Sequence, residues 1–354
     1  MLIACLNPGS SSTKLSVVDG DVTVSQSSIA PDGANMDLST VLPEGISAAA
    51  IRVVHGGMEF REPTLVQGDV LARLRKLSWL APLHNPAALR LIDRLRETRP
   101  DLPLVACFDT AFHATLAAEA YTYPVPRSWT QDWGLRRFGF HGLSHAYASR
   151  RAGQLLGRRP GRLVTCHLGA GASLCAVRDG RSVDTTMGFT PMDGLMMATR
   201  SGSVDPGLIL FALRQGLSAE AIERGLDRES GILGVSGISS DFRQVVAASD
   251  DGDPSARLAL NIYRHRLAQG IAAMVTSLGG IDALVFTGGV GENLPHLWER
   301  TCAALAFIGV GLDTGQLAVD SLDQRLPTVD RTIAVLVIHA REDLEMARQA
   351  SSLL

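Results

Sequence analysis

Short apolar runs, each bounded by glycine, proline or polar residues, recur along the chain. Runs of this length are typical of buried strands and are too short for most helices. The predicted strands occupy residues 2–6, 15–18, 51–54, 104–108, 163–166, 174–177, 283–286 and 333–338.

Helical patterns lie between and after these runs, and two of them have clear boundaries. Asp253 can cap a helix that has Pro254 as its first residue and ends at Gly279. Its apolar positions recur at spacings of three and four, which places them on one face. That face consists of Leu260, Tyr263, Leu267, Ile271, Met274 and Leu278. A second helix is predicted from Asp205 to Gly216, and the alternation of strands and helices predicts an α/β protein.

One segment recurs after about 160 residues. Residues 7–20 read Asn-Pro-Gly-Ser-Ser-Ser-Thr-Lys-Leu-Ser-Val-Val-Asp-Gly, and residues 167–180 read His-Leu-Gly-Ala-Gly-Ala-Ser-Leu-Cys-Ala-Val-Arg-Asp-Gly. Each copy follows an apolar run, so each predicts a β-hairpin whose first turn leaves backbone N–H groups uncovered. Two such turns opposite one another would hold a polyphosphate between two similar domains. Two ordinary hairpins would give the same pattern.

A third glycine turn, Thr-Gly-Gly-Val-Gly-Glu-Asn at 287–293, follows an apolar run and precedes a helical segment. Such a turn offers backbone donors to a nucleotide. Glycine also serves in tight turns for purely steric reasons, so this turn alone decides little. Lys14 lacks the spacing of a Walker A motif. The three turns together favour a nucleotide site of another kind.

Composition narrows the class of protein. With 354 residues, 46% hydrophobic and 19% charged, the chain is globular and long enough for about two domains. A formal net charge of -3 gives no general attraction to nucleic acid or to an anionic membrane. The five cysteines show no metal-ligand spacing, and no apolar stretch has the length of a membrane span. We expect a cytoplasmic protein with reduced thiols, without nucleic-acid or membrane partners.

Charged and imidazole side chains follow several of the apolar runs. They are Arg52, His55, Asp109, His113, His141, His145, Arg200 and Glu342. A single buried arginine or histidine is most often structural. Their number at predicted strand ends nevertheless favours a functional site.

Nine motifs extend these observations over almost the whole chain. They are Asn-Pro-Gly-Ser-Ser-Ser (7–12), Arg-Val-Val-His-Gly-Gly (52–57), Ala-Pro-Leu-His-Asn-Pro (81–86), Phe-Asp-Thr-Ala-Phe-His (108–113), Gly-Phe-His-Gly-Leu-Ser-His (139–145), Cys-His-Leu-Gly-Ala-Gly (166–171), Gly-Phe-Thr-Pro-Met-Asp-Gly-Leu (188–195), Gly-Val-Ser-Gly-Ile-Ser-Ser-Asp-Phe-Arg (234–243) and Gly-Gly-Val-Gly-Glu-Asn (288–293). In sequence and order they resemble the acetate and propionate kinase family, within the superfamily of actin, heat-shock ATPases and sugar kinases.

The resemblance implies two similar ribonuclease-H-like α/β domains with the active site in the cleft between them. The first domain would comprise residues 1–112 and 340–354. The second, 113–339, would bind the nucleotide and form a homodimer. The implied reaction is reversible, Mg²⁺-dependent in-line transfer of a phosphoryl group from ATP to acetate, which gives acetyl phosphate and ADP. A short carboxylic acid is already ionised at neutral pH, so catalysis needs positive charge and positioning more than a strong base.

Three other readings remain open. One is a propionate or butyrate kinase, and another is a nucleotide-binding homologue with weakened catalysis. The third is a module that uses ATP to change conformation, as in the actin and heat-shock relatives. Dependence of ATP turnover on an added carboxylate separates this third reading from the enzymes.

By resemblance, each site residue has an expected role. Arg52 would hold the substrate carboxylate, while Arg200 and His141 would stabilise charge on the phosphoryl group in transfer. Asp109 matches the family's essential acid, described as a proton donor or acceptor. Because the substrate is already ionised, we expect Asp109 to organise Mg²⁺, water or an arginine instead.

The remaining expected groups are an acyl pocket, an ATP site and a metal site. The acyl pocket would consist of Val54, Leu83, Phe140 and Pro191. The ATP residues would be Lys14, His167, Leu168, Gly169, Ala170, Gly171, Asp241, Phe242, Arg243, Gly289, Val290, Gly291, Glu292 and Asn293. Asn7 and Glu342 would hold Mg²⁺, with Mn²⁺ as an alternative, since Mg²⁺ accepts few protein oxygens when water and phosphate complete its shell. An apolar pocket distinguishes one methylene by only about 1–3 kcal/mol, so acetate is favoured over propionate only slightly.

Three details depart from the family or have a simpler explanation. Ala170 stands where relatives carry Asn, so we expect weaker nucleotide affinity with activity retained. Arg341 replaces part of a Pro-Thr-Asn-like stretch and would pair with Glu342 in competition with Mg²⁺. Asp241 and Arg243 have a structural alternative, since they would also pair with each other on a loop.

Overall fold

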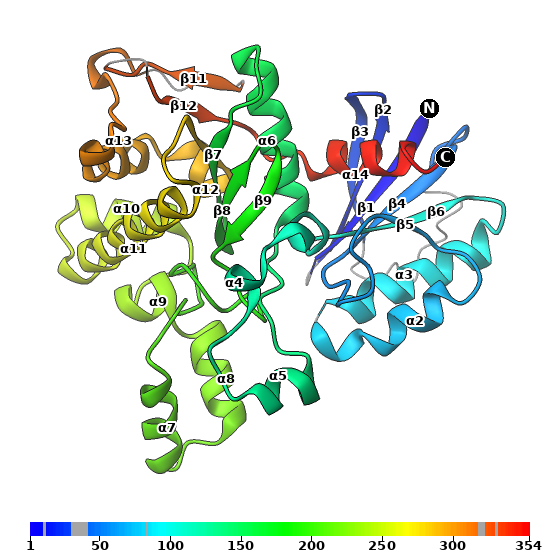
Figure 1. Ribbon diagram of the computed structural model, residues 1–354, viewed down its shortest axis with the longest axis horizontal. Coiled ribbons are helices and arrows are strands. Elements are labelled where there is room, and N and C mark those ends of the chain that lie inside the picture. The colour runs from blue at the N-terminus through cyan, green and yellow to red at the C-terminus, as the bar shows by residue number, and fades with distance from the viewer. Residues whose placement is uncertain (10–11, 30–41, 83, 318–322, 330–331) are drawn as a thin grey trace. The chain divides into compact units, whose positions relative to one another are not determined.

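The computed structural model describes residues 1–9, 12–29, 42–82, 84–317, 323–329 and 332–354. The described chain forms two compact units, which are drawn in Figure 1. Unit 1 contains residues 1–114, 140–147 and 341–354, and unit 2 contains residues 115–139 and 148–340. The C-terminal segment therefore returns to the unit in which the chain begins.

In the described residues, unit 1 is built on a six-stranded mixed sheet of order β3-β2-β1-β4-β6-β5. The strands are β1 (Leu2–Pro8), β2 (Thr13–Asp19), β3 (Val22–Ile29), β4 (Ala48–Val53), β5 (Thr64–Leu65) and β6 (Leu104–Phe108). β1, β4 and β6 are parallel, and β2 and β3 extend the sheet as antiparallel neighbours. The helices are α2 (Val70–Lys76), α3 (Asn85–Thr98) and α14 (Glu342–Ser351). α3 and α14 pack against the central strands.

Unit 2 has a sheet of order β11-β12-β10-β7-β8-β9. Its strands are β7 (Arg162–Leu168), β8 (Ala172–Arg178), β9 (Arg181–Thr185), β10 (Ala283–Thr287), β11 (Gln324–Leu326) and β12 (Ala334–Val337). Its helices are α4 (Ala118–Tyr121), α5 (Arg127–Trp133), most of α6 (Gly142–Leu156), α7 (Pro206–Arg214), α8 (Ala219–Arg228), α9 (Gly231–Ser236), α10 (Phe242–Asp250), α11 (Pro254–Leu278), α12 (Gly288–Asn293) and α13 (Pro295–Ala304). Single 3₁₀ turns lie at Ser78–Leu80, Ala111–Thr115, Ala306–Ile308 and Thr314–Gln316.

The two sheets have the same topology. Reading β3-β2-β1-β4-β6-β5 beside β9-β8-β7-β10-β12-β11 gives the same pairing direction at every step. The repeated segments form the matching hairpins, with Asn7 opposite Lys14 in one and His167 opposite Ser173 in the other. The prediction of two similar α/β domains is therefore confirmed.

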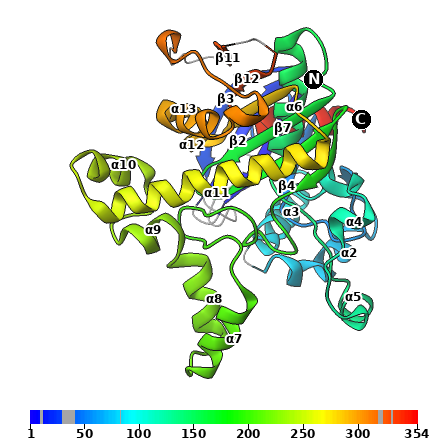
Figure 2. The same ribbon diagram turned by 60° about the vertical axis from the view of Figure 1, so that its left-hand side comes forward.

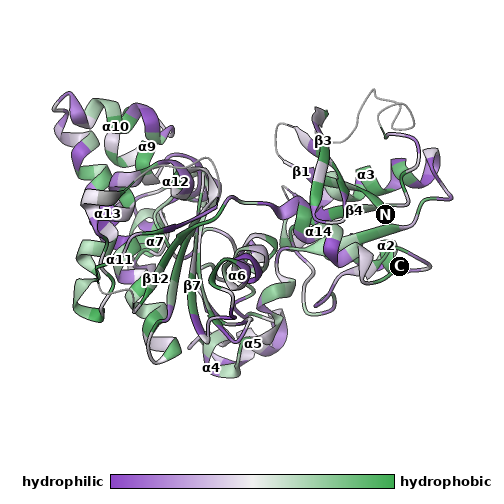
Figure 3. Cartoon of the chain, turned by 90° about the horizontal axis from the view of Figure 1, so that it is seen from above, coloured by the Kyte–Doolittle hydropathy of each residue, from purple (hydrophilic) through white to green (hydrophobic). Residues whose placement is uncertain are grey.

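The apolar runs predicted the strands well, because each of them overlaps a described strand. The strands β7 and β12 are green over much of their length in Figure 3, as expected for buried strands. The sequence did not indicate β3 or β9, whose residues are largely polar. β3 is mostly exposed and depends on its ladder with β2, so its strand character is set by pairing more than by apolar side chains.

The predicted helix boundaries are also confirmed. The Asp253 side chain accepts a hydrogen bond from the backbone N–H of Ala256, and Gly279 ends α11 in the left-handed conformation at φ 69°. Asp205 caps α7 in the same way. The apolar face of α11 is buried, and the helix packs along β7, β8 and β9 (Figure 2). Within the described residues, no helix is both long and apolar enough to cross a membrane.

Candidate functional site

Four polar residues of unit 1 are joined by hydrogen bonds. Asn7, Arg52 and Asp109 lie at the carboxyl ends of β1, β4 and β6, where ligands commonly bind to parallel sheets. Arg52 donates to Asp109 Oδ2 through Nε at 2.9 Å and also through Nη2. Its Nη1 donates to Asn7 Oδ1 at 2.9 Å, and Asn7 Nδ2 donates to Glu342 Oε2 at 2.8 Å. The structure thus brings together four predicted site residues from separate parts of the sequence.

The carboxylates near Arg52 favour the positively charged form of its guanidinium. Burial by itself lowers the pKa of Arg52, but the carboxylates of Asp109 and Glu342 outweigh this effect and raise it. Burial raises the pKa of Asp109, and the guanidinium of Arg52 offsets part of the rise. We expected Asp109 to organise Mg²⁺, water or an arginine, and the structure shows it bound to an arginine, Arg52. Its other oxygen, Oδ1, is buried and has no hydrogen-bond partner among the described residues.

The loop that carries His141 is tied to the same aspartate. The backbone N–H of Gly142, the first residue of α6, donates to the carbonyl of Asp109 at 2.8 Å. His141 has φ 56°, a left-handed conformation that is uncommon for residues other than glycine. A Cβ at position 142 would overlap the Asp109 carbonyl. Close approach of the two backbones therefore requires glycine at this position.

The other histidines near this loop are structural. His55 and His113 are buried, and ring nitrogen Nε2 of His113 lies 3.0 Å from the carbonyl of Phe140. Nδ1 of His55 accepts from the backbone N–H of Gly57 at 2.9 Å, and burial lowers the pKa of His55 to about 4. The ring of His145 packs edge-on against that of His113. Burial therefore favours the neutral form of His55, and the rings of His113 and His145 pack beside the loop.

Two of the four expected acyl-pocket residues lie in this part of unit 1. Val54 and Phe140 are buried, and Phe140 packs edge-on against His55, the chain neighbour of Val54. Leu83 lies outside the described residues. Lys14 is exposed and stands directly opposite Asn7 in the β1–β2 hairpin, so both side chains point to the same face of the sheet.

In unit 2, two of the expected ATP segments are neighbours. The 167–171 turn follows β7 and the 288–293 segment follows β10, and these strands are parallel and adjacent. A Cβ on Gly288 would lie 2.7 Å from the carbonyl oxygen of Leu168, so the two turns approach at backbone distance. The Glu292 carboxylate accepts the backbone N–H groups of Gly288 at 2.7 Å and Ala340 at 2.9 Å. Glu292 therefore stabilises the turn through these two hydrogen bonds.

The third ATP segment adjoins a pocket. Asp241 caps α10 and accepts from Arg243 Nη2 at 2.6 Å, so the structural pairing that the sequence left open is present. A pocket of about 500 Å³ extends from Phe242 along α10, and Leu294, directly after α12, lines its other side. The pocket thus lies beside Phe242 of the 241–243 segment and directly after the 289–293 segment. Arg264 is among its further lining residues.

Arg200 lies in the long loop between β9 and α7. Its Nε donates to Asp227 Oδ1 at 2.9 Å, and its Nη1 donates to the carbonyl of Pro191 at 3.3 Å. No residue in the described part of the chain bonds to its Nη2 group. Asp227 follows no recognisable motif, and the sequence gave no signal that it would hold Arg200.

The expected pairing of Arg341 with Glu342 is replaced by another arrangement. Arg341 Nε donates to Asp343 Oδ1 at 3.1 Å, and its Nη2 donates to Thr23 on the missed strand β3. These partners draw the guanidinium toward β3, while Glu342 receives the amide of Asn7. The carboxylate of Glu342 is therefore held by a neutral donor.

The residues expected at the metal fit a sparsely ligated Mg²⁺. The described residues contain no cluster of three or more His, Cys, Asp or Glu side chains that would enclose an ion. Glu342 uses only Oε2 in its bond with Asn7, and Asp109 Oδ1 is also without a partner in the described chain. Carboxylate oxygens are the donors that Mg²⁺ prefers, with phosphate and water as the remaining ligands.

Comparisons with known proteins agree with these observations. Residues 34–348 match the Acetokinase family. The acetate kinase of Trichormus variabilis is 49% identical over 312 residues, which make up 87% of this chain and 77% of that protein. The crystal structure of the acetate kinase of Porphyromonas gingivalis superposes with a TM-score of 0.92 at 32% identity, over 99% of each chain. A propionate kinase from Francisella tularensis gives 0.90 at 33% identity, over 98% of each chain. The resemblance indicated by the motifs is confirmed, and the chain belongs to the acetokinase family.

Proposed function

We propose that the protein is an acetate kinase that transfers a phosphoryl group reversibly between ATP and acetate. The observation that carries the proposal is the hydrogen-bonded series Asp109, Arg52, Asn7 and Glu342, which sets one fixed cation beside oxygen ligands for a metal. Membership of the acetokinase family supports it. Direct in-line transfer needs these elements and no covalent protein intermediate.

Arg52 binds the carboxylate of the substrate. A guanidinium has five N–H donors, and Arg52 uses three of them for Asp109 and Asn7, so two remain for a ligand. Acetate arrives ionised, so Asp109 need not act as a base. Its role is to hold Arg52 in one orientation, which keeps the nucleophilic oxygen in line with the phosphoryl group.

Charge on the transferring phosphoryl group is stabilised by Arg200 and His141. Arg200 has its Nε and Nη1 groups held by Asp227 and Pro191, so its orientation is fixed before substrate binds. Fixed donors cost no reorganisation during the reaction and are effective in a water-poor site. His141 sits in a constrained backbone conformation, which likewise limits its positions.

Asn7 and Glu342 would hold Mg²⁺, which would supply positive charge to neutralise the phosphates. Lys14 and the 167–171 turn receive the phosphates, and the 289–293 turn with Asp241, Phe242 and Arg243 receives the nucleoside. The pocket beside Phe242 has the volume of an ordinary ligand site, at about 500 Å³. Val54, Phe140 and Pro191 contact the methyl group of acetate.

Propionate kinase is the second candidate, because a propionate kinase is as similar to this chain as an acetate kinase. The deciding experiment measures acyl phosphate as its hydroxamate with MgATP and acetate, propionate or butyrate in turn. We expect the highest kcat/KM with acetate. A higher value with propionate would reassign the substrate. An ATP turnover rate that does not change when any of the carboxylates is added would instead support a module that uses ATP to change conformation.

Restoring asparagine at position 170 is expected to strengthen ATP binding. A single neutral hydrogen bond contributes about 0.5–1.5 kcal/mol, so Ala170→Asn should lower the Kd for ATP by roughly two- to tenfold with little change in kcat. Isothermal titration calorimetry measures the effect. Ala170→Val adds volume without a polar atom and serves as the control. An unchanged Kd in Ala170→Asn would contradict the assigned contact.

We further propose a homodimer through unit 2. Helix α7 has no buried residue, and Leu208, Leu210, Phe211 and Leu213 on it are at least 44% exposed. Figures 1 and 2 both show α7 and α8 extending away from the sheet of unit 2. An apolar helix of this kind is typical of a surface that is covered by a partner.

Phe211→Glu is therefore expected to convert the dimer to a monomer in sedimentation equilibrium at micromolar concentration. Phe307→Glu is the matched control, since Phe307 is also an exposed phenylalanine of unit 2 but lies far along the chain from α7. A wild-type monomer, or a dimer unaffected by Phe211→Glu, would refute this interface.

The domain boundaries and the location follow the family. We assign one domain to residues 1–112 and 340–354 and the other to residues 113–339, a division that differs from the two compact units at residues 113–114, 140–147 and 340. A cytoplasmic location is supported by the five cysteines, all of which are buried free thiols.

A further inference from the structure

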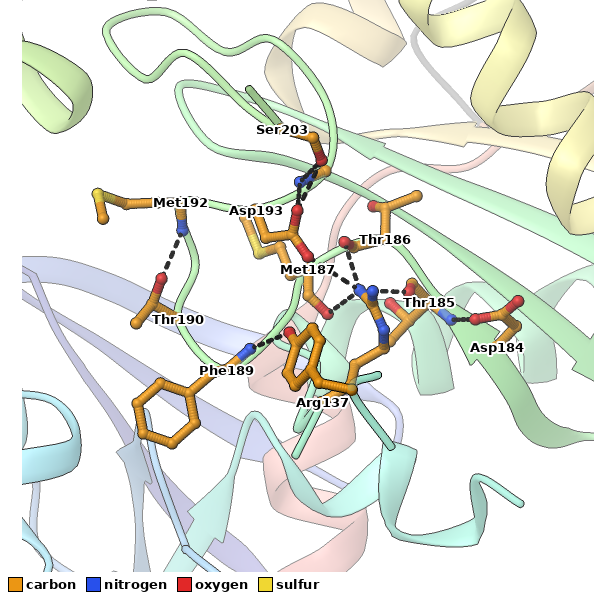
Figure 4. A network of polar contacts seen from close by, with 12 residues as sticks. Arg137, Asp184, Thr185, Thr186, Met187, Phe189, Thr190, Met192, Asp193 and Ser203 are labelled. Atoms are coloured by element: carbon orange, nitrogen blue, oxygen red, sulfur yellow. Dashed lines mark hydrogen bonds and ion pairs between the residues drawn. The ribbon is translucent and has the colours of Figure 1, made fainter. Parts of the chain in front are cut away.

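Arg137 binds several groups on one loop of unit 2. Its Nη1 lies within hydrogen-bond distance of three successive carbonyl oxygens, those of Thr185 at 3.2 Å, Thr186 at 2.8 Å and Met187 at 3.1 Å. The same group lies 3.3 Å from the Asp193 carboxylate. Figure 4 shows these acceptors grouped around one guanidinium. One side chain thus fixes the start of the loop that follows β9 and also a residue further along it.

Tyr123 provides a second attachment beside the first. Its ring lies under the guanidinium of Arg137, 5.7 Å from centroid to Cζ, and its hydroxyl accepts the backbone N–H of Phe189 at 2.8 Å. Burial raises the pKa of Tyr123, so the hydroxyl stays neutral. A Cβ on Gly188 would overlap the Tyr123 hydroxyl and lie 2.6 Å from Asp193, so this stretch is closely packed.

The contacts continue to the far side of the loop. Asp193 Oδ1 accepts from the hydroxyl of Ser203 at 2.6 Å (Figure 4). The backbone N–H of Ser203 donates to the carbonyl of Gly194 at 3.0 Å. Arg200 lies between these two points of attachment, and it donates to the carbonyl of Pro191 within the same loop. Residues 193–203 therefore form a segment whose two ends are bonded to each other, and Arg200 lies within this segment.

We infer that Arg137 is a positioning residue that sets the place of Pro191 and Arg200 through the loop 185–203. The inference rests on the proposed function, because it concerns where these two residues meet acetate and the phosphoryl group. Within the described part of the chain, the Arg137 side chain donates hydrogen bonds only to groups of this loop, so it need not touch substrate. A lysine cannot replace it, because a single ammonium lacks the planar fork that reaches several acceptors at once.

Two variants test the inference, Arg137→Ala and Arg137→Lys. Loss of about 1 Å of precision in a catalytic group costs up to about 100-fold in rate. We expect kcat/KM for acetate to fall by about that factor in both variants, with most of the loss in kcat and the KM for ATP within twofold of wild type. Added guanidinium is expected to restore part of the activity of Arg137→Ala, whereas methylammonium is not.

A second readout follows the loop without relying on activity. Hydrogen exchange of the 185–203 segment should accelerate in Arg137→Ala, because Phe189 and Gly194 lose the fixed partners of their N–H groups. Arg162→Ala is the matched control. Arg162 also joins a carboxylate, Asp282, and a backbone carbonyl in unit 2, but none of its hydrogen bonds in the described chain reaches this loop.

The two readouts separate the possible failures. Unchanged exchange in 185–203, or loss of activity equal to that of Arg162→Ala, would overturn the positioning role. A wild-type protein that phosphorylates no carboxylate would refute the proposed function, and the exchange experiment would still decide whether Arg137 holds the loop. Faster exchange together with a kcat loss that guanidinium reverses supports the inference.

Discussion

Arg52→Met is expected to abolish acetate phosphorylation and to lower the free energy of unfolding as well. The variant loses the cation assigned to the substrate carboxylate and leaves Asp109, whose side chain is 1% exposed, without its partner. Breaking a buried ion pair from one side costs about 3–5 kcal/mol, because the remaining charge stays out of water. We expect kcat/KM to fall by at least roughly three orders of magnitude, given that the fixed cation acts on binding and positioning together.

A double variant separates catalysis from folding. Arg52→Met combined with Asp109→Asn removes both charges, so most of the lost stability should return while activity remains absent. Chemical denaturation and the hydroxamate assay measure the two quantities. Full stability in Arg52→Met alone, or activity in the double variant, would contradict the assigned pair.

The stability of Arg52→Met should also depend on pH. Without the guanidinium, burial and Glu342 both raise the pKa of Asp109 above its value in the unfolded chain. An acid with a raised folded-state pKa disfavours folding once pH exceeds the pKa of the unfolded chain, about 3.9. The difference in unfolding free energy between wild type and variant should therefore be small near that pH and grow toward neutrality. A constant difference would show that Asp109 is not the cause.

Gly142→Ala is expected to lower kcat by about 100-fold with the fold retained. The added Cβ would overlap the carbonyl of Asp109 and lie 3.0 Å from the Cβ of Phe112, so the backbone must move. This movement displaces His141, the preceding residue, and breaks the 2.8 Å bond from Gly142 to Asp109. Steady-state kinetics with circular dichroism as a check on folding measures the effect.

The matched control is another helical glycine with open space around it. Gly225 lies in α8, and a Cβ there would meet nothing within 4 Å. Gly225→Ala should leave activity unchanged and raise stability slightly, since alanine is favoured over glycine by about 1 kcal/mol in helices. Equal losses of activity in both variants would show that Gly142→Ala acts through the stability of the whole protein and not through the His141 loop.

Local signals in the sequence were sufficient for much of the fold. Uninterrupted apolar runs identified central strands because these strands are buried on both sides, and the repeat at 7–20 and 167–180 identified the two hairpins. Asp253 and Gly279 marked the ends of α11 because capping depends on residues a few positions apart. The exposed strand β3 was missed, since its stability comes from pairing with β2 and its side chains carry little pattern.

The site residues were identified by motif, but their partners were decided only by the tertiary structure. No sequence pattern couples Asp109 to Arg52, or Arg200 to Asp227, because these pairs form where separate strands and loops converge. The clearest failure is Arg341, which was expected to contact its neighbour Glu342. The guanidinium instead reaches Asp343 and Thr23, on a strand that the sequence did not reveal. Residue types and short spacings thus determine strands, caps and candidate chemistry, whereas the direction in which a long charged side chain points depends on which segments the fold brings beside it.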